Sequence, residues 1–151
     1  MSIDICRDYV TSAFRFYARN GKSTEKFKKK IYIEAIKSGM IRTGAKGSGI
    51  SSPTEAVIVA AERAVNDKLA EINDMEAVEK TLAELFVLRK YETLQAVDIV
   101  YFKGCVEKNE DIKRKVHIAE LNIPASESSI YRWLKLARKI FANERGLRVE
   151  E

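Results

Sequence analysis

Apolar residues recur every three or four positions along most of the chain, which is the spacing of one face of an α-helix. The first such stretch extends from about Ile3 to Arg19 and ends at Asn20-Gly21, a pair typical of a helix C-terminus. The second extends from about Thr24 to Ser38. Its apolar face carries Phe27, Ile31, Ala35 and Ile36, and its opposite face carries Lys26, Lys29, Lys30 and Lys37.

The middle of the chain predicts a linker followed by three helices. Residues 39–51 lack helical spacing and hold most of the glycines, which predicts a flexible linker. Ser52, Pro53 and Glu55 form a helix start with Ser52 as the cap, and this helix is expected to reach about Glu71. Asn73 or Asp74 is expected to cap the next helix. The apolar positions of that helix are Val78, Leu82, Leu85 and Phe86. After a break near residues 89–93, a further helix has Leu94, Val97, Val100 and Tyr101 as its apolar positions and ends at Phe102-Lys103-Gly104.

Two further helices are predicted near the C-terminus. They span about Asp111 to Leu121 and Ser126 to Asn143, with Ser126 as the cap of the second and Gly146 after its end. No segment alternates as a β-strand does, so we predict an all-α fold. The expected division is a basic N-terminal helical hairpin in residues 1–50, a connecting helix in residues 51–72 and a helix-turn-helix domain in residues 73–151.

Composition argues against a membrane protein and predicts a cytoplasmic one. Charged residues make up 32% of the 151 positions, and no apolar run approaches the roughly 18 residues of a spanning helix. The first residues lack the basic start and apolar stretch of a signal peptide. The two cysteines, Cys6 and Cys105, make neither a disulfide framework nor a metal site.

Charge is unevenly distributed. Residues 1–50 carry 11 Lys and Arg against 4 Asp and Glu, a net charge of +7, whereas residues 51–102 carry 5 against 10, a net charge of −5. Residues 103–151 carry 11 against 8, a net charge of +3. Basic faces attract polyanions such as DNA, but a run such as Lys28-Lys29-Lys30 is also the pattern of a solvated helix face.

The last helix has the pattern of a DNA-reading helix. Ile130, Trp133 or Leu134, Ala137 and Phe141 are expected to face the core. A recognition helix needs small polar residues near its start and basic residues one or two turns later. The expected base-reading residues are Ser128, Ser129, Arg132 and Lys135, and the expected phosphate-binding residues are Lys113, Arg114, Lys115, Ser126, Tyr131, Arg138 and Lys139. An ordinary charged helix face is the alternative interpretation.

Residues 76–145 resemble the C-terminal helix-turn-helix of bacterial sigma factors (region 4), and resemble phage late-transcription regulators of the ArpU type more closely. Four segments carry the resemblance: residues 77–85, 96–104, 118–120 and 126–138. It implies binding of double-stranded DNA at a promoter-like site and contact with RNA polymerase. The sequence departs from the family where Asn122-Ile123-Pro124-Ala125 replaces a turn glycine and lengthens the motif by one residue, which leaves the angle of the last helix open. The first 70 residues match no part of a sigma factor.

Nothing in the sequence predicts an enzyme, a metal site or a cofactor. The sole histidine, His117, has no nucleophile or metal-ligand partner at helical spacing. The glycine-rich segment 44–49 lacks the Gly-Lys-Ser/Thr order of a phosphate loop, and no strand precedes it.

The leading hypothesis is therefore a sequence-specific, DNA-binding transcription regulator of phage or prophage origin. The first alternative is a phage DNA-packaging protein, similar to a small terminase subunit, whose N-terminal helices build a homo-oligomeric ring. The second is a helical protein–protein adaptor without DNA binding.

Overall fold

The computed structural model describes residues 5–42, 54–103 and 110–147, and these residues form seven α-helices and one π-helical turn without any strand. The predicted all-α fold is confirmed. In chain order the elements are α1 (Ile5–Arg19), α2 (Thr24–Arg42), α3 (Glu55–Asn66), α4 (Leu69–Val87), α5 (Tyr91–Val97), the π-helical turn η1 (Asp98–Phe102), α6 (Glu110–Asn122) and α7 (Glu127–Arg145). None of the helices in these three ranges combines the length and apolar character needed to cross a membrane.

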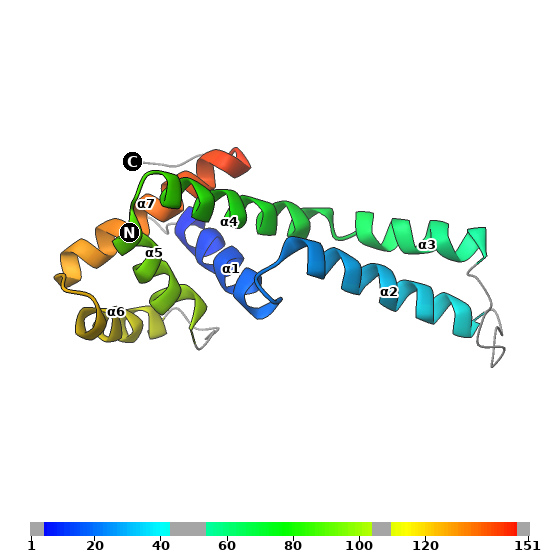
Figure 1. Cartoon of the computed structure of the whole chain (residues 1–151), viewed down its shortest axis with the longest axis horizontal. Helices are drawn as coiled ribbons and strands as arrows, with labels where there is room; N and C mark the ends of the chain where they lie inside the picture. Colours follow the sequence, from blue (N-terminus) through cyan, green and yellow to red (C-terminus); the bar gives the residue numbers. More distant parts are fainter. Residues whose placement is uncertain (1–4, 43–53, 104–109, 148–151) are drawn as a thin grey trace.

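The molecule is elongated, with a helical body at one end and a projecting hairpin at the other (Figure 1). Helices α1, α4, α5, α6 and α7 make up the body together with η1. Helices α2 and α3 run antiparallel to each other to form the hairpin, and α3 leads almost straight into α4. Helix α6 and the first half of α7 lie at the end opposite the hairpin tip.

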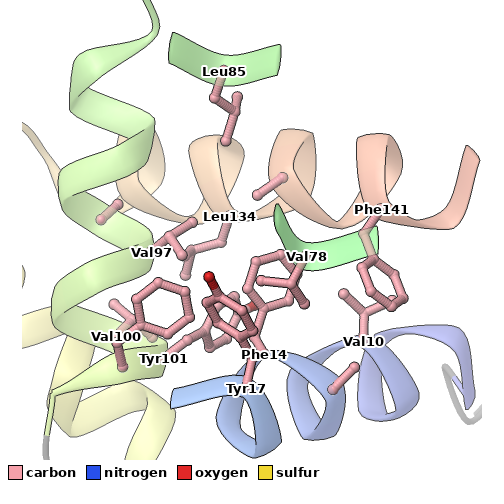
Figure 2. Close-up of a cluster of buried hydrophobic side chains, with 14 of the residues drawn as sticks. Val10, Phe14, Tyr17, Val78, Leu85, Val97, Val100, Tyr101, Leu134 and Phe141 are labelled. Atoms are coloured by element: carbon pink, nitrogen blue, oxygen red, sulfur yellow. The ribbon is translucent and has the colours of Figure 1, made fainter. Parts of the chain in front are cut away.

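Phe14 is the centre of the core of the body. Its ring has no solvent exposure and lies 5.4 Å from the ring centroid of Tyr101, 6.1 Å from that of Phe102 and 5.6 Å from that of Phe141. These contacts join α1 to η1 and α7, and Figure 2 shows Val78 of α4 and Leu134 of α7 in the same cluster. Helix α1 is therefore an integral part of the body.

The packing groups the N-terminal helices differently from the expected division at residues 50 and 72. Helix α1 packs on α4, η1 and α7, whereas α2 packs along α3. Among the described residues of this region, α1 and α2 thus do not pair with each other as a hairpin, because α2 packs along α3. The reason is the large aromatic side chains of α1, which are buried against residues far away in the sequence.

Helix α2 continues through Gly39 to Arg42, so the break predicted to begin at Gly39 starts later. A Cβ atom at Gly39 would lie 2.8 Å from Cγ1 of Val57. The missing side chain therefore lets α2 and α3 approach closely, and this glycine serves packing between two helices. The remainder of the predicted linker, residues 43–53, lies outside the described residues.

Two predicted helix starts are wrong. Helix α3 is capped by Thr54, whose hydroxyl accepts a hydrogen bond from the Val57 N–H at 3.3 Å, and Ser52 lies outside the described residues. The break between α3 and α4 falls at Asp67-Lys68, so neither Asn73 nor Asp74 caps a helix. Asp74 lies within α4, and its carboxylate binds Tyr9 and Arg145.

Other predicted ends are confirmed. The break near residues 89–93 is present, because α4 ends at Val87 and α5 begins at Tyr91, with Arg89 at a φ of 59° in the turn. The π-helical form of η1 was not predicted by the spacing of apolar residues. Gly146 ends α7 in the left-handed conformation with a φ of 70°.

A carboxylate from α4 caps the start of α2. Glu79 accepts hydrogen bonds from the Thr24 hydroxyl and, at 3.3 Å, from the Thr24 N–H, where a negative charge also interacts favourably with the helix dipole. The Tyr17 hydroxyl donates to the Lys22 carbonyl at 2.9 Å and lies 3.3 Å from the same carboxylate. Burial and the neighbouring charge of Glu79 raise the pKa of Tyr17 to about 12.

We expect Phe14→Ala to lower the free energy of unfolding by about 3–5 kcal/mol, because it leaves a cavity where three helical elements meet. Phe86→Ala is the matched control, since the Phe86 side chain is 63% exposed and its loss should cost less than about 1 kcal/mol. Urea denaturation followed by circular dichroism measures both values. Equal losses for the two variants would contradict the central position of Phe14.

We expect stability to fall between about pH 10 and pH 12 through ionisation of Tyr17. The pKa is raised in the folded state, so the contribution is complete below the unfolded pKa near 10 and is lost as the pH rises through 12. The difference between spectrophotometric titrations of the native chain and Tyr17→Phe isolates this phenol. A difference curve centred near pH 10 would show that the Tyr17 phenol is not buried beside Glu79.

Candidate nucleic-acid interface

Helices α6 and α7 are joined by a short turn that is held by a buried side chain and by backbone hydrogen bonds. Ile123 is 2% exposed, its N–H donates to the Ala119 carbonyl at 2.8 Å, and its own carbonyl accepts from the Ala125 N–H at 2.7 Å. Pro124 lies on the outside of the turn. A buried isoleucine thus anchors this corner.

Ser126 caps α7, as predicted. Its hydroxyl accepts a hydrogen bond from the Ser129 N–H at 3.3 Å and lies 3.1 Å from the Ser129 hydroxyl. Arg132 donates to that same Ser129 hydroxyl at 3.1 Å. The first turn of α7 is therefore internally bonded, and it holds the guanidinium of Arg132 near the start of the helix.

The buried face of α7 fixes which residues point outward. Ile130, Leu134, Ala137 and Phe141 have no solvent exposure, and the helix packs on α4, α5, α6 and α1. The opposite face is exposed. We call the four residues that lie along it the outer stripe: Ser128, Arg132, Lys135 and Lys139. Three of these side chains are cations.

Three of the four residues expected to read bases lie on the outer stripe, and Ser129 does not. Ser129 is half-buried at the flank of α7, where its hydroxyl is bonded to Ser126 and Arg132. The helical spacing placed Ser129 within reach of the outer face, but it did not reveal the hydrogen bonds within the first turn.

The seven residues expected to bind phosphate divide into separate groups. Arg114 and Lys139 are exposed cations, whereas Ser126 is occupied as a cap. The ammonium group of Lys115 donates to the Lys103 carbonyl at 2.7 Å and so ties α6 to the end of η1. The remaining three, Lys113, Tyr131 and Arg138, line a cleft together with Arg7 of α1. Arg138 also donates to the Tyr101 hydroxyl at 3.1 Å.

The far end of α7 is fixed by a cluster that the sequence did not reveal. Asp74 of α4 accepts hydrogen bonds from Arg145 at 2.7 Å and from the Tyr9 hydroxyl at 2.7 Å. Burial raises the pKa of Tyr9, and the hydrogen bond to Asp74 raises it further, so the phenol stays protonated at neutral pH. The cluster joins α1, α4 and α7 at one point.

Candidate catalytic and metal-binding groups do not gather in the described parts of the chain. His117 lies on the surface of α6, with its Nδ1 3.5 Å from Glu120 Oε1. Within residues 5–42, 54–103 and 110–147, no group of three His, Cys, Asp or Glu side chains is placed to hold a metal ion. Cys105 and the glycine-rich segment 44–49 lie outside the described residues, and the surroundings of the Cys6 side chain are not described.

We expect Ser126→Ala to lower the free energy of unfolding by about 0.5–2 kcal/mol, because the Ser129 N–H loses its hydrogen-bond acceptor. Ser128→Ala is the matched control, since Ser128 is exposed and lies two positions further along the same helix. Thermal and urea denaturation measure both variants. If both serines prove equally neutral, Ser126 is not the cap of α7.

No protein-family model matches this chain, and no curated protein or solved structure is significantly similar to it. The interpretation of the outer stripe and the cleft therefore depends on their geometry and charge. Both belong to the same end of the molecule, since both are built on α7.

Proposed function

We propose that the chain is a sequence-specific, DNA-binding transcription regulator that places α7 in the major groove of a promoter-like site. The observation that carries the proposal is the outer stripe. It presents one small polar residue near the capped start of the helix, followed by three cations on one exposed face. The groove, about 12 Å wide, admits an α-helix of this kind.

The chemistry of the outer stripe favours DNA over an uncharged partner. The guanidinium of Arg132 can bind the O6 and N7 atoms of guanine with two hydrogen bonds, and the Ser128 hydroxyl can donate to or accept from a base edge. Lys135 lies one turn further along and either reads a base or grips the backbone. Lys139 lies further along α7, and this residue and Arg114 of α6, both exposed cations, contribute phosphate contacts.

The resemblance to sigma factor region 4 and to regulators of the ArpU type supports the same function. Of the segments that carry the resemblance, residues 77–85 lie within α4, residues 118–120 within α6 and residues 127–138 within α7. Phage or prophage origin and contact with RNA polymerase are parts of this proposal that rest on the resemblance alone.

We expect Arg132→Ala to cost about 1–3 kcal/mol in binding the best site and to relax the base preference at one position. Lys139→Ala should weaken binding to all sequences alike and reduce the slope of log affinity against log salt by about 1. Lys37→Ala, which removes an exposed charge from the α2–α3 hairpin, is the control and should change neither property. Electrophoretic mobility shifts at several salt concentrations measure these effects.

The site itself is found by selecting bound fragments of the source genome with the purified chain and with the Arg132→Ala, Lys135→Ala double variant. A shared motif that disappears in the double variant supports reading by α7, and its position relative to genes tests promoter control. Recovery of random fragments by both proteins would refute sequence-specific recognition. Identical behaviour of Arg132→Ala and Lys139→Ala would refute the division of roles along the outer stripe.

A second candidate is a DNA-packaging subunit, which the projecting hairpin favours. Ile33 and Ile41 of α2 and Val59 of α3 are exposed at 49%, 71% and 46%, and such apolar side chains suit self-association. A packaging ring requires a defined oligomer larger than a dimer. Light scattering coupled to gel filtration distinguishes this candidate from a monomeric or dimeric regulator.

A further inference from the structure

A cleft of about 230 Å³ lies between α1, η1, α6 and α7, beside the outer stripe. The side chains that give it its character are Arg7, Asp8, Thr11, Lys113, Tyr131 and Arg138. They come from α1 at one end of the chain and from α6 and α7 near the other. The cleft is therefore a product of the tertiary fold and not of one helix face.

The cleft has the electrostatics of an anion site. Three cations and one carboxylate line it, which leaves a net charge of +2. The carboxylate of Asp8 lies 3.9 Å from Nε of Arg7, so it partly neutralises that guanidinium. Lys113 makes no ion pair with any residue that the structure describes. A small anion would compensate the remaining charge.

Thr11 supplies an independent sign of a missing ligand. Its side chain is 2% exposed, and its hydroxyl has no hydrogen-bond partner among the described residues. Buried hydroxyls are normally bonded, because leaving one unpaired costs free energy. Thr11 lines the cleft, where an acceptor oxygen of a ligand can take this hydrogen bond.

Two phenols complete the donor set. The Tyr101 hydroxyl accepts from Arg138 at 3.1 Å, which leaves its own hydrogen available to donate. Burial raises the pKa of Tyr131, with Glu127 and Glu120 adding to the effect, so this phenol is also a donor at neutral pH. The cleft thus combines cationic and hydroxyl donors from several directions.

We propose that this cleft binds a terminal phosphate group, either as inorganic phosphate or as part of a small phosphomonoester. A terminal phosphate carries a charge of about −1.5 to −2 at pH 7 and three acceptor oxygens, which matches the net charge of +2 and the number of donors. A carboxylate or a DNA phosphodiester carries only one negative charge. The volume is below the roughly 300–1,000 Å³ of clefts that hold drug-sized ligands, so the ligand is small.

This inference does not depend on DNA binding, because the outer stripe plays no part in it. A bound phosphate would nevertheless bridge α1 to α6 and α7, the two helices of the proposed DNA interface. It would then stabilise their arrangement, and a phosphorylated small molecule would act as an effector of the regulator.

The test measures phosphate binding by the full chain, with phosphorus NMR line broadening and thermal melting at constant ionic strength set with chloride. We expect saturable binding, which distinguishes the site from the general stabilisation that phosphate exerts as an excluded salt. Lys113→Gln should weaken binding roughly tenfold to a hundredfold by removing a charged hydrogen-bond donor. Acetate, a monoanion, should compete poorly, and sulfate, a tetrahedral dianion, should compete well.

Thr11→Val distinguishes a ligand-binding hydroxyl from a merely structural one. Valine has the same shape, so the variant should melt in chloride at the same temperature as the native chain or higher, yet bind phosphate several-fold more weakly. Lys135→Gln removes a cation from the outer stripe and serves as the control, with unchanged phosphate binding. Phosphate binding that is absent, or equal in all four proteins, would overturn the proposal.

The DNA assay keeps the two proposals apart. If Lys113→Gln and Thr11→Val weaken DNA binding while the native chain ignores free phosphate, the cleft receives a phosphate of the DNA backbone and the terminal-phosphate assignment is wrong. If the chain binds free phosphate, this binding depends on both residues and no DNA is bound, the phosphate site is supported and the proposed DNA function is wrong.

Discussion

The arrangement of the body depends on the burial of one aromatic ring from the first helix. Phe14 contacts Tyr101, Phe102 and Phe141, so a single side chain of α1 holds together η1 and α7, which are separated by α6 in the chain. Burial of rings of this size is among the largest favourable contributions that single residues make. The position of α7, and with it the outer stripe and the cleft, follows from the docking of α1.

Local signals in the sequence predicted several helix ends correctly, although they missed the Thr54 cap of α3. The cap at Ser126, the left-handed end at Gly146 and the turn before Tyr91 depend on residues within a few positions, and all three were predicted. The apolar spacing of α7 likewise placed Ile130, Ala137 and Phe141 in the core, and it left open the choice between Trp133 and Leu134, of which Leu134 is the fully buried one.

Predictions failed where a distant partner decides. Asp74 has the residue type of a helix cap, but Arg145 and Tyr9 bind its carboxylate inside α4. Lys115 and Arg138 have the residue types of DNA contacts, but the Lys103 carbonyl and the Tyr101 hydroxyl accept hydrogen bonds from them, and their contact with DNA stays a prediction. The sequence did not predict Thr11 and Arg7 as site residues, because only the approach of α1 to α6 and α7 brings them to the cleft.

The two attachments of the α2–α3 hairpin have a mechanical consequence. Helix α2 leaves the body through the turn after α1, where Glu79 binds Thr24, the first residue of α2. Helix α3 returns to the body through Asp67-Lys68. Both attachments lie at the body end of the hairpin, and α3 runs almost in line with α4. With about 18 Å of helix in α3, a tilt of about ten degrees would move the tip by roughly 3 Å. A force on the hairpin tip would therefore reach the body of the molecule through α4.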